Sequence, residues 1–415
     1  MSARSPRAAG MRRRPARYTD RAPSAALREA LHAHRKGDLA AAAAGYLRAL
    51  DDDPDDLDAR VNLGAVWTAR GRCDDARRTL TQAAAHPAAD ARALRDVGMS
   101  LAALGHFTLA RAVYARAHAL DPRHVGVLLA WSRASGEDGA PDALDLARRA
   151  TALAPEDPGA WIARYRAALD LAAAAEADAS VAQAAAWDPG PVGASLLAAH
   201  LAGEGRVDEA RRALDARTLP AGLDAAVRWR CDHPATPTFG ARRAGLVRAL
   251  DAAPRAGAVL EFGVRYGLSA RVLAAHTDRV VHGFDSFEGL PLAWGALPPG
   301  AFTMERHAPE LPANVALHVG RFDETLPGFV AAMREAPALI HVDSDLYESA
   351  RTVLRALGPR VPAGCVLLFD EYLGNEAWRD DEHRAWTECA AAFGWRAEVV
   401  GASLVTGQVA LRVLG

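Results

Sequence analysis

Cysteine and lysine are scarce in this sequence. Its 415 residues include four cysteines, Cys73, Cys231, Cys365 and Cys389, and one lysine, Lys36. Because the cysteines lie far apart and form no C-x-x-C pair, they argue against a zinc site and against a disulfide framework. Scattered cysteines of this kind fit a reducing compartment, so we expect a cytoplasmic protein.

Excess charge and long apolar runs are also missing. The formal net charge is −2, which provides no basic footprint for a nucleic acid or for a membrane surface. No apolar run approaches the ~18 residues of a membrane-spanning helix. The composition therefore predicts neither a nucleic acid nor a membrane as partner, and the length allows about two to three domains.

Residues 1–22 are rich in arginine, alanine and proline, with Arg12, Arg13 and Arg14 in a row. This composition predicts a disordered basic tail, and the alternative is an arm that binds an acidic partner.

Residues 23–216 carry a repeat. Gly37, Gly71, Gly105 and Gly139 are each 34 residues apart. A series of prolines steps by 33 to 35 residues in parallel with them: Pro54, Pro87, Pro122, Pro155 and Pro189. A 34-residue period with glycine at a helix–helix turn is the tetratricopeptide signature, so we predict an all-α solenoid of five units and a degenerate sixth. The resemblance to such arrays implies a protein partner or self-association.

The pattern changes after residue 216. Prolines and glycines between 217 and 240 predict a linker. From 241 to 415, apolar runs alternate with helical segments, which predicts a twisted, mostly parallel α/β sheet of the Rossmann-like type. The stretch from Leu290 to Ala313 has no periodic pattern, and we expect it to be a loop that covers a substrate.

The stretch from Ala258 to Leu273 predicts the ligand site of this second domain. It reads as a strand, a turn with Glu261, Gly263 and Gly267, and the start of a helix. The turn is not G-x-G-x-x-G, and a carboxylate beside it would repel a pyrophosphate, so an NAD(P) oxidoreductase is disfavoured. The same carboxylate would attract the cationic cofactor S-adenosylmethionine.

Four apolar strands end in, or run into, a carboxylate: Glu261, Asp285, Asp343 and Asp370. In an open α/β sheet, ligands bind outside the carboxyl ends of the strands. Asp285 is placed to accept hydrogen bonds from the ribose hydroxyls of the cofactor. Gly320 and Phe322 are placed to line the pocket of its adenine ring. The residues that we expect to contact S-adenosylmethionine are Glu261, Phe262, Gly263, Gly267, Ser269, Asp285, Ser286, Gly320 and Phe322.

The segment HVDSDLY places Asp343 and Asp345 two residues apart, and Asp370 and Glu371 follow the next strand. Clustered carboxylates repel unless they are protonated or neutralised. Mg²⁺ is the simplest neutraliser, with Asp343, Asp370 and Glu371 as its ligands and Asp345 left to act as a base. We expect His282 and His341 to be packing residues inside strands and His307 to be a surface residue.

Five blocks together resemble the macrocin-type sugar O-methyltransferases, a family of class I enzymes that use S-adenosylmethionine. The blocks are LEFGVRYGLSARVLA, VHGFDSFEGLP, NVALHVGRFDETLP, IHVDSDLYESA and VLLFDEY. The resemblance implies Asp343, Asp370 and Glu371 as Mg²⁺ ligands and Asp345 as the general base. It also implies a hydroxylated small molecule, a sugar or a glycosylated compound, as the acceptor. Glu371 stands where some members have Asp, and the repeats lie outside the resemblance.

Two other functions remain open. In the first, the chain is a scaffold: the repeats bind a partner and the α/β domain is not catalytic. In the second, it is a methyltransferase that works without a metal ion, or that methylates a carrier-bound or protein acceptor.

Overall fold

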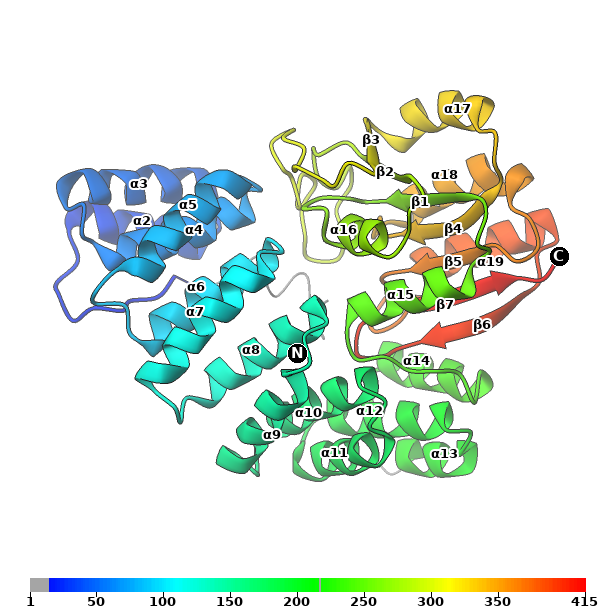
Figure 1. The fold of residues 1–415 in the computed structure, drawn as a ribbon, viewed down its shortest axis with the longest axis horizontal. Helices are drawn as coiled ribbons and strands as arrows, with labels where there is room; N and C mark the ends of the chain where they lie inside the picture. The colour runs from blue at the N-terminus through cyan, green and yellow to red at the C-terminus, as the bar shows by residue number, and fades with distance from the viewer. Residues whose placement is uncertain (1–14, 216–217) are drawn as a thin grey trace.

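Paired helices make up the first half of the chain. The structure is a computed structural model that describes residues 15–215 and 218–415. Its first helices are α2 (Ala25–Lys36), α3 (Leu39–Asp52), α4 (Leu57–Ala69), α5 (Cys73–Ala85), α6 (Ala91–Ala103), α7 (Phe107–Leu120), α8 (Val125–Asp138), α9 (Ala143–Leu153), α10 (Pro158–Asp170), α11 (Ala174–Trp187), α12 (Pro191–Gly203) and α13 (Val207–Asp215). They form successive antiparallel hairpins that stack along a curved array (Figure 1), which confirms the predicted tetratricopeptide solenoid.

The repeated glycines make the hairpin turns. Gly37, Gly71, Gly105 and Gly139 have φ between +73° and +83°, a left-handed conformation that glycine adopts without a steric cost. The fifth hairpin has Ala172 at the same place in its turn, with φ of +53°. The sixth hairpin has Gly205, with φ of +78°, so all six share one turn geometry although one of them lacks the glycine.

The N-terminal segment differs from the predicted tail. Residues 1–14 lie outside the described residues, but Arg17 and Tyr18 are attached to the array. The Tyr18 hydroxyl donates to Asp96 at 2.8 Å, and Arg17 pairs with the buried Asp58 at 2.7 Å. The prediction of a disordered tail through residue 22 is therefore wrong for Arg17 and Tyr18. Buried carboxylates need donors, and these donors come from positions too distant in sequence for a local pattern to reveal.

The predicted linker, residues 217–240, contains a helix, α14 (Ala221–Asp232). Its Gly222 carbonyl accepts a hydrogen bond of 2.9 Å from the indole of Trp378, which is 1% exposed. Trp229 on α14 packs edge-on against Tyr372. The linker prediction is therefore wrong, because the prolines and glycines of this stretch flank a helix that packs on the second domain.

The second domain is a seven-stranded sheet between two layers of helices (Figure 1). Its strands are β1 (Ala258–Phe262), β2 (Val281–Asp285), β3 (Val315–Val319), β4 (Pro337–Val342), β5 (Val366–Phe369), β6 (Ala397–Ala402) and β7 (Val409–Val413). Its helices are α15 (Arg242–Ala252), α16 (Leu268–Ala275), α17 (Phe322–Ala332), α18 (Tyr347–Leu357), the short 3₁₀ helix η1 (Gly358–Arg360) and α19 (Glu382–Phe393). The strand order is β3-β2-β1-β4-β5-β7-β6, and β1 to β5 are parallel while β7 is antiparallel to both neighbours. This confirms the predicted Rossmann-like, mostly parallel sheet.

Alternate side chains of the strands enter two different cores. Val259, for example, packs with α15 and α16 on one face of the sheet, whereas Leu260 packs with α17, α18 and α19 on the other. Both faces are covered, which explains why the strands read as continuous apolar runs. Within residues 15–215 and 218–415, no helix is long and apolar enough to cross a membrane.

Candidate active site between the repeats and the sheet

Strand register brings three predicted residues to one edge. Glu261 on β1 lies beside His341 on β4, and Phe262 lies beside Val342. The next residue, Asp343, donates its backbone N–H to the Phe262 carbonyl at 2.8 Å. The Asp370 N–H in turn donates to the Val342 carbonyl at 2.9 Å. The chain goes from β1 to β2 on one side and to β4 on the other, so this edge is the switch point at which such sheets bind ligands.

Gly263 is required by this packing. Its φ is +99°, and a Cβ there would lie 1.9 Å from the Asp343 carbonyl oxygen. Gly267, with φ of +72°, caps the N-terminus of α16. The glycine turn therefore brings the backbone of β1 against β4, as a ligand-binding turn after a first strand does.

Glu261 is fully buried at the edge of the glycine turn. Its Oε1 accepts a hydrogen bond from the Ser269 hydroxyl and lies 3.4 Å from Nδ1 of His341. Its Oε2 has no hydrogen-bond partner among the described residues. Such an atom is costly to bury unless a ligand satisfies it, and a cationic amine is the ligand group that suits a carboxylate oxygen.

Asp285 holds the same turn from β2. One carboxylate oxygen accepts from the N–H groups of Val264 and Arg265 at 2.9 and 2.8 Å, and the other accepts from the Phe287 N–H at 2.7 Å. Each oxygen has two lone pairs, so Asp285 retains acceptor capacity for a ribose. Three other predicted contacts lie near Asp285 or its neighbour strand β1. The Gly320 N–H donates to the Asp285 carbonyl, Ser286 accepts from the Glu288 N–H, and Phe322 packs edge-on against Phe262.

Asp343, Asp345, Asp370 and Glu371 are all buried near this edge. Asp343 and Asp370 form a group with His341 in which one ligand atom of each lies within 4.8 Å of the others. Glu371 does not belong to that group. Asp345 has φ of +60°, an uncommon left-handed conformation of the kind found at functional sites.

Three residues that the sequence did not single out complete this cluster: Arg242, Glu382 and Gln408. Arg242 donates from Nε to Asp370 and from Nη2 to Glu371, each at 2.9 Å. The Gln408 amide donates to the other oxygen of Asp370 at 2.7 Å. Glu382 on α19 accepts from the backbone N–H groups of Glu371 and Ser344. The sequence shows no local signal for these contacts, because they join residues that are 11 to 129 positions apart in the chain.

Burial and neighbouring charges together shift the pKa of two of these groups. Burial and the neighbouring charge of Asp343 raise the pKa of Glu382 well above its usual value. Burial alone would lower the pKa of His341. Its carboxylate partners Asp370 and Glu261 outweigh that effect and raise this pKa to about 10. His341 therefore packs inside β4 as expected, but it also supplies a positive charge.

The predicted Mg²⁺ site does not fit this arrangement. Mg²⁺ requires oxygen ligands at ~2.0–2.1 Å in near-ideal octahedral geometry. Two of the three predicted ligands, Asp370 and Glu371, are bridged by the Arg242 guanidinium, so an ion bound by both carboxylates would have to displace that cation. The third, Asp343, lies beside His341 in the group described above.

The repeat array packs directly on the glycine turn. The Tyr266 hydroxyl donates to the carbonyl of Thr68, at the end of α4, at 2.5 Å. Tyr266 and Val264 belong to the same buried apolar cluster as helices α2 to α8. The array and the sheet domain therefore share one core at this point.

Three successive turn glycines of the array face the sheet domain. A Cβ on Gly71 would lie 2.6 Å from the Met304 Cα, and one on Gly105 would lie 2.1 Å from Leu268. A Cβ on Gly139 would lie 2.6 Å from the guanidinium carbon of Arg243. A Cβ on Gly37 would meet nothing within 4 Å. Glycine at the second, third and fourth turns thus serves both the hairpin and the domain contact.

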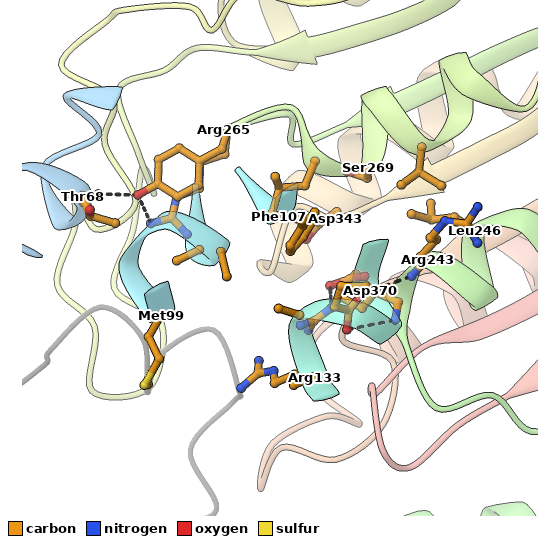
Figure 2. Close-up of a pocket in the computed structure, with 18 of the residues that line it drawn as sticks. Thr68, Met99, Phe107, Arg133, Arg243, Leu246, Arg265, Ser269, Asp343 and Asp370 are labelled. Atoms are coloured by element: carbon orange, nitrogen blue, oxygen red, sulfur yellow. Dashed lines mark hydrogen bonds and ion pairs between the residues drawn. The ribbon is translucent and has the colours of Figure 1, made fainter. Parts of the chain in front are cut away.

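A cavity of about 370 Å³ lies between the two domains. Figure 2 shows side chains that converge on it from both sides, with Asp343 and Asp370 on the sheet side. The array contributes residues of its first helices in successive hairpins, α4, α6 and α8, together with α7: Thr68, Met99, Phe107, Tyr114, Arg133 and Glu137. The sheet domain contributes the turn and the start of α16, including Val264, Leu268 and Ser269, and also Arg242 and Arg243. Asp345 is not among the residues that line it.

The loop from 290 to 313 forms its own small core. Leu290, Leu297 and Phe302 pack with Leu346, the neighbour of Asp345. The Trp294 indole donates to Asp381 at 3.1 Å, which ties the loop to the start of α19. The loop therefore lies beside the predicted base, as a covering loop would.

Comparisons with known proteins give one family match and several structural resemblances. Residues 260–372 match a family described as a methyltransferase domain. No match was found among curated proteins. Among solved structures, the chain resembles the calicheamicin methyltransferase CalS11, at 22% identity over 51% of this chain and 91% of that one, with a TM-score of 0.33. It also resembles the O-methyltransferase NovP, at 23% identity over 42% and 80% with a TM-score of 0.33. The tetratricopeptide protein YrrB is similar at 18% identity over 40% and 87%, with a TM-score of 0.35. The chain thus combines a tetratricopeptide region with a methyltransferase domain.

Proposed function

We propose that the protein is an O-methyltransferase that uses S-adenosylmethionine to methylate a hydroxyl of a sugar or of a glycosylated small molecule. The observation that carries this proposal is the switch-point edge, where the glycine turn of β1, the buried Glu261 and the Asp343–Asp345 segment meet beside one cavity. The proposed domains are the array up to residue 216 and the methyltransferase domain from 241 to 415.

The chain's own residues suit the cofactor. Glu261 has a buried oxygen that lacks a partner, and it would hold the ammonium group. Phe262, Gly263, Gly267 and Ser269 lie along the same strand–turn–helix segment. Asp285 would accept ribose hydroxyls, with Ser286, Gly320 and Phe322 around it. When bound, S-adenosylmethionine supplies a methyl group on a sulfonium, which is already an activated donor.

The acceptor would occupy the cavity between the domains. Its volume of about 370 Å³ falls within the ~300–1,000 Å³ range of small-molecule sites. Asp345 would take the proton of the acceptor hydroxyl, a contribution of about 10²- to 10⁴-fold. Asp343 lines the cavity and is the other carboxylate available for that role. Enclosure by the array would orient the acceptor and exclude water.

The structure also bears on the scaffold alternative. The helices α4, α6 and α8 line the cavity, so this face of the array is engaged with the chain's own methyltransferase domain. That contact favours a role of the array in building the site. A protein partner or self-association would have to use another face.

Calorimetric titration of S-adenosylmethionine into the full chain tests the proposal. We expect the native protein to bind S-adenosylmethionine. In Asp285→Ala the affinity should fall at least roughly 10-fold, which corresponds to about 1.4 kcal/mol. In Asp323→Ala the affinity should not change. Asp323 is an exposed aspartate at the start of α17 and serves as the matched control. Absence of binding to the native protein would refute the proposal and favour the scaffold.

A further inference from the structure

A cation of the protein, Arg242, bridges Asp370 and Glu371 and offsets one of their two negative charges. The Arg242 guanidinium lies across both carboxylates with two N–H···O contacts of 2.9 Å. The carboxylate side chains are 1% and 2% exposed, and that of Arg242 is 20% exposed. A planar guanidinium fork matches this geometry better than any other side chain does.

Two further hydrogen bonds hold the pair in place. Gln408 donates to the second oxygen of Asp370 at 2.7 Å from the turn before β7. The Glu371 backbone N–H donates to Glu382. A divalent ion bound by both Asp370 and Glu371 in place of Arg242 would cost the two charge-assisted hydrogen bonds of that guanidinium.

The array fixes the position of Arg242. Glu137, at the end of α8, has its carboxylate oxygens 3.4 Å from the backbone nitrogens of Arg242 and Arg243. Arg166 of α10 lies 3.5 Å from Glu137 and donates to the Gly240 carbonyl at 2.9 Å. The start of α15 is therefore held between two hairpins and the carboxylate pair, which favours a fixed Arg242.

We infer that Arg242 takes the place of a divalent metal at Asp370 and Glu371, and that the site works without Mg²⁺. The expected effect on turnover rests on the proposed function, whereas the absence of a bound metal ion does not. Arg242 also lines the cavity, so its charge lies beside the acceptor. It is a positioning residue that offsets one of the two negative charges of the pair, whereas Asp343 and Asp345 act on the hydroxyl.

Mn²⁺ binding tests the inference without turnover. Mn²⁺ is titrated into the full chain and the free ion is followed by electron paramagnetic resonance. We expect no Mn²⁺ bound to the native protein at this site. In Arg242→Ala the carboxylate pair is uncovered, and we expect one Mn²⁺ per chain, which is lost again in the double variant Arg242→Ala with Asp370→Asn. Arg243→Ala, the neighbouring arginine, is the matched control and should bind no ion.

Mn²⁺ bound to the native protein and lost in Asp370→Asn would overturn the inference. Loss of turnover in EDTA that Mg²⁺ restores would overturn it as well. If Arg242→Ala does not fold, as judged by circular dichroism, Arg242→Lys and the native titration still decide. Failure of the proposed function gives a different result, because S-adenosylmethionine then does not bind while the Mn²⁺ titration keeps its outcome.

Discussion

The two walls of the cavity differ in composition. The array wall is mostly alanine and other apolar side chains, and Arg133 and Glu137 are its charged members among the lining residues. The sheet wall carries Asp343, Asp370 and several arginines. Repeated hairpins thus supply a shaped surface, whereas the reactive groups come from the strand ends. A fold that places strand ends at one edge concentrates polar side chains there, and a helical solenoid distributes them along its length.

The comparison predicts that chemistry depends on the sheet wall. In Asp345→Asn we expect turnover to fall by about 10²- to 10⁴-fold because the base is lost. Binding of S-adenosylmethionine, measured by calorimetry, should not change. Glu348→Gln, an exposed carboxylate on α18, should leave both unchanged. Full turnover in Asp345→Asn together with loss of turnover in Asp343→Asn would move the base to the cavity-lining aspartate.

The junction between the array and the sheet domain at α14 depends on a buried aromatic side chain. Trp378→Ala removes a side chain that is 1% exposed and its hydrogen bond to Gly222. We expect a loss of about 3–5 kcal/mol in unfolding free energy, measured in urea. Trp187→Ala, on an array helix and 44% exposed, should change it by less than about 0.5 kcal/mol. Equal losses in the two variants would contradict a tight junction at α14.

The turn glycines sharpen the comparison further. Gly71→Ala and Gly37→Ala introduce similar backbone strain, because their φ angles are +73° and +83°. Only the Gly71 variant pushes into the backbone of Met304. We therefore expect Gly71→Ala to cost about 1–3 kcal/mol more than Gly37→Ala in urea. It should also speed proteolysis of the loop from 290 to 313. If the two variants unfold alike, the array does not press on the sheet domain.

The smallest effect concerns the array alone. Ala172 adopts φ of +53°, where other turns have glycine. Ala172→Gly should relieve about 1 kcal/mol of strain and raise the melting temperature, without any effect on S-adenosylmethionine binding. Ala173→Gly, with ordinary φ of −89°, should give no such gain. A destabilised Ala172→Gly would mean that the fifth turn is not strained.

Local patterns were sufficient for much of this protein. A 34-residue period and apolar runs that end in carboxylates depend on neighbours in the chain, so the hairpins, the sheet and the edge with Glu261, Asp285, Asp343 and Asp370 could be predicted. Only the tertiary structure decided the packing of the array on the glycine turn, the helical nature of the linker and the Arg242 pair. These depend on contacts between segments more than one hundred residues apart, such as Arg242 with Asp370 and Tyr266 with Thr68. An arginine at the start of a helix looks like a solvated charge until folding brings two buried carboxylates to it.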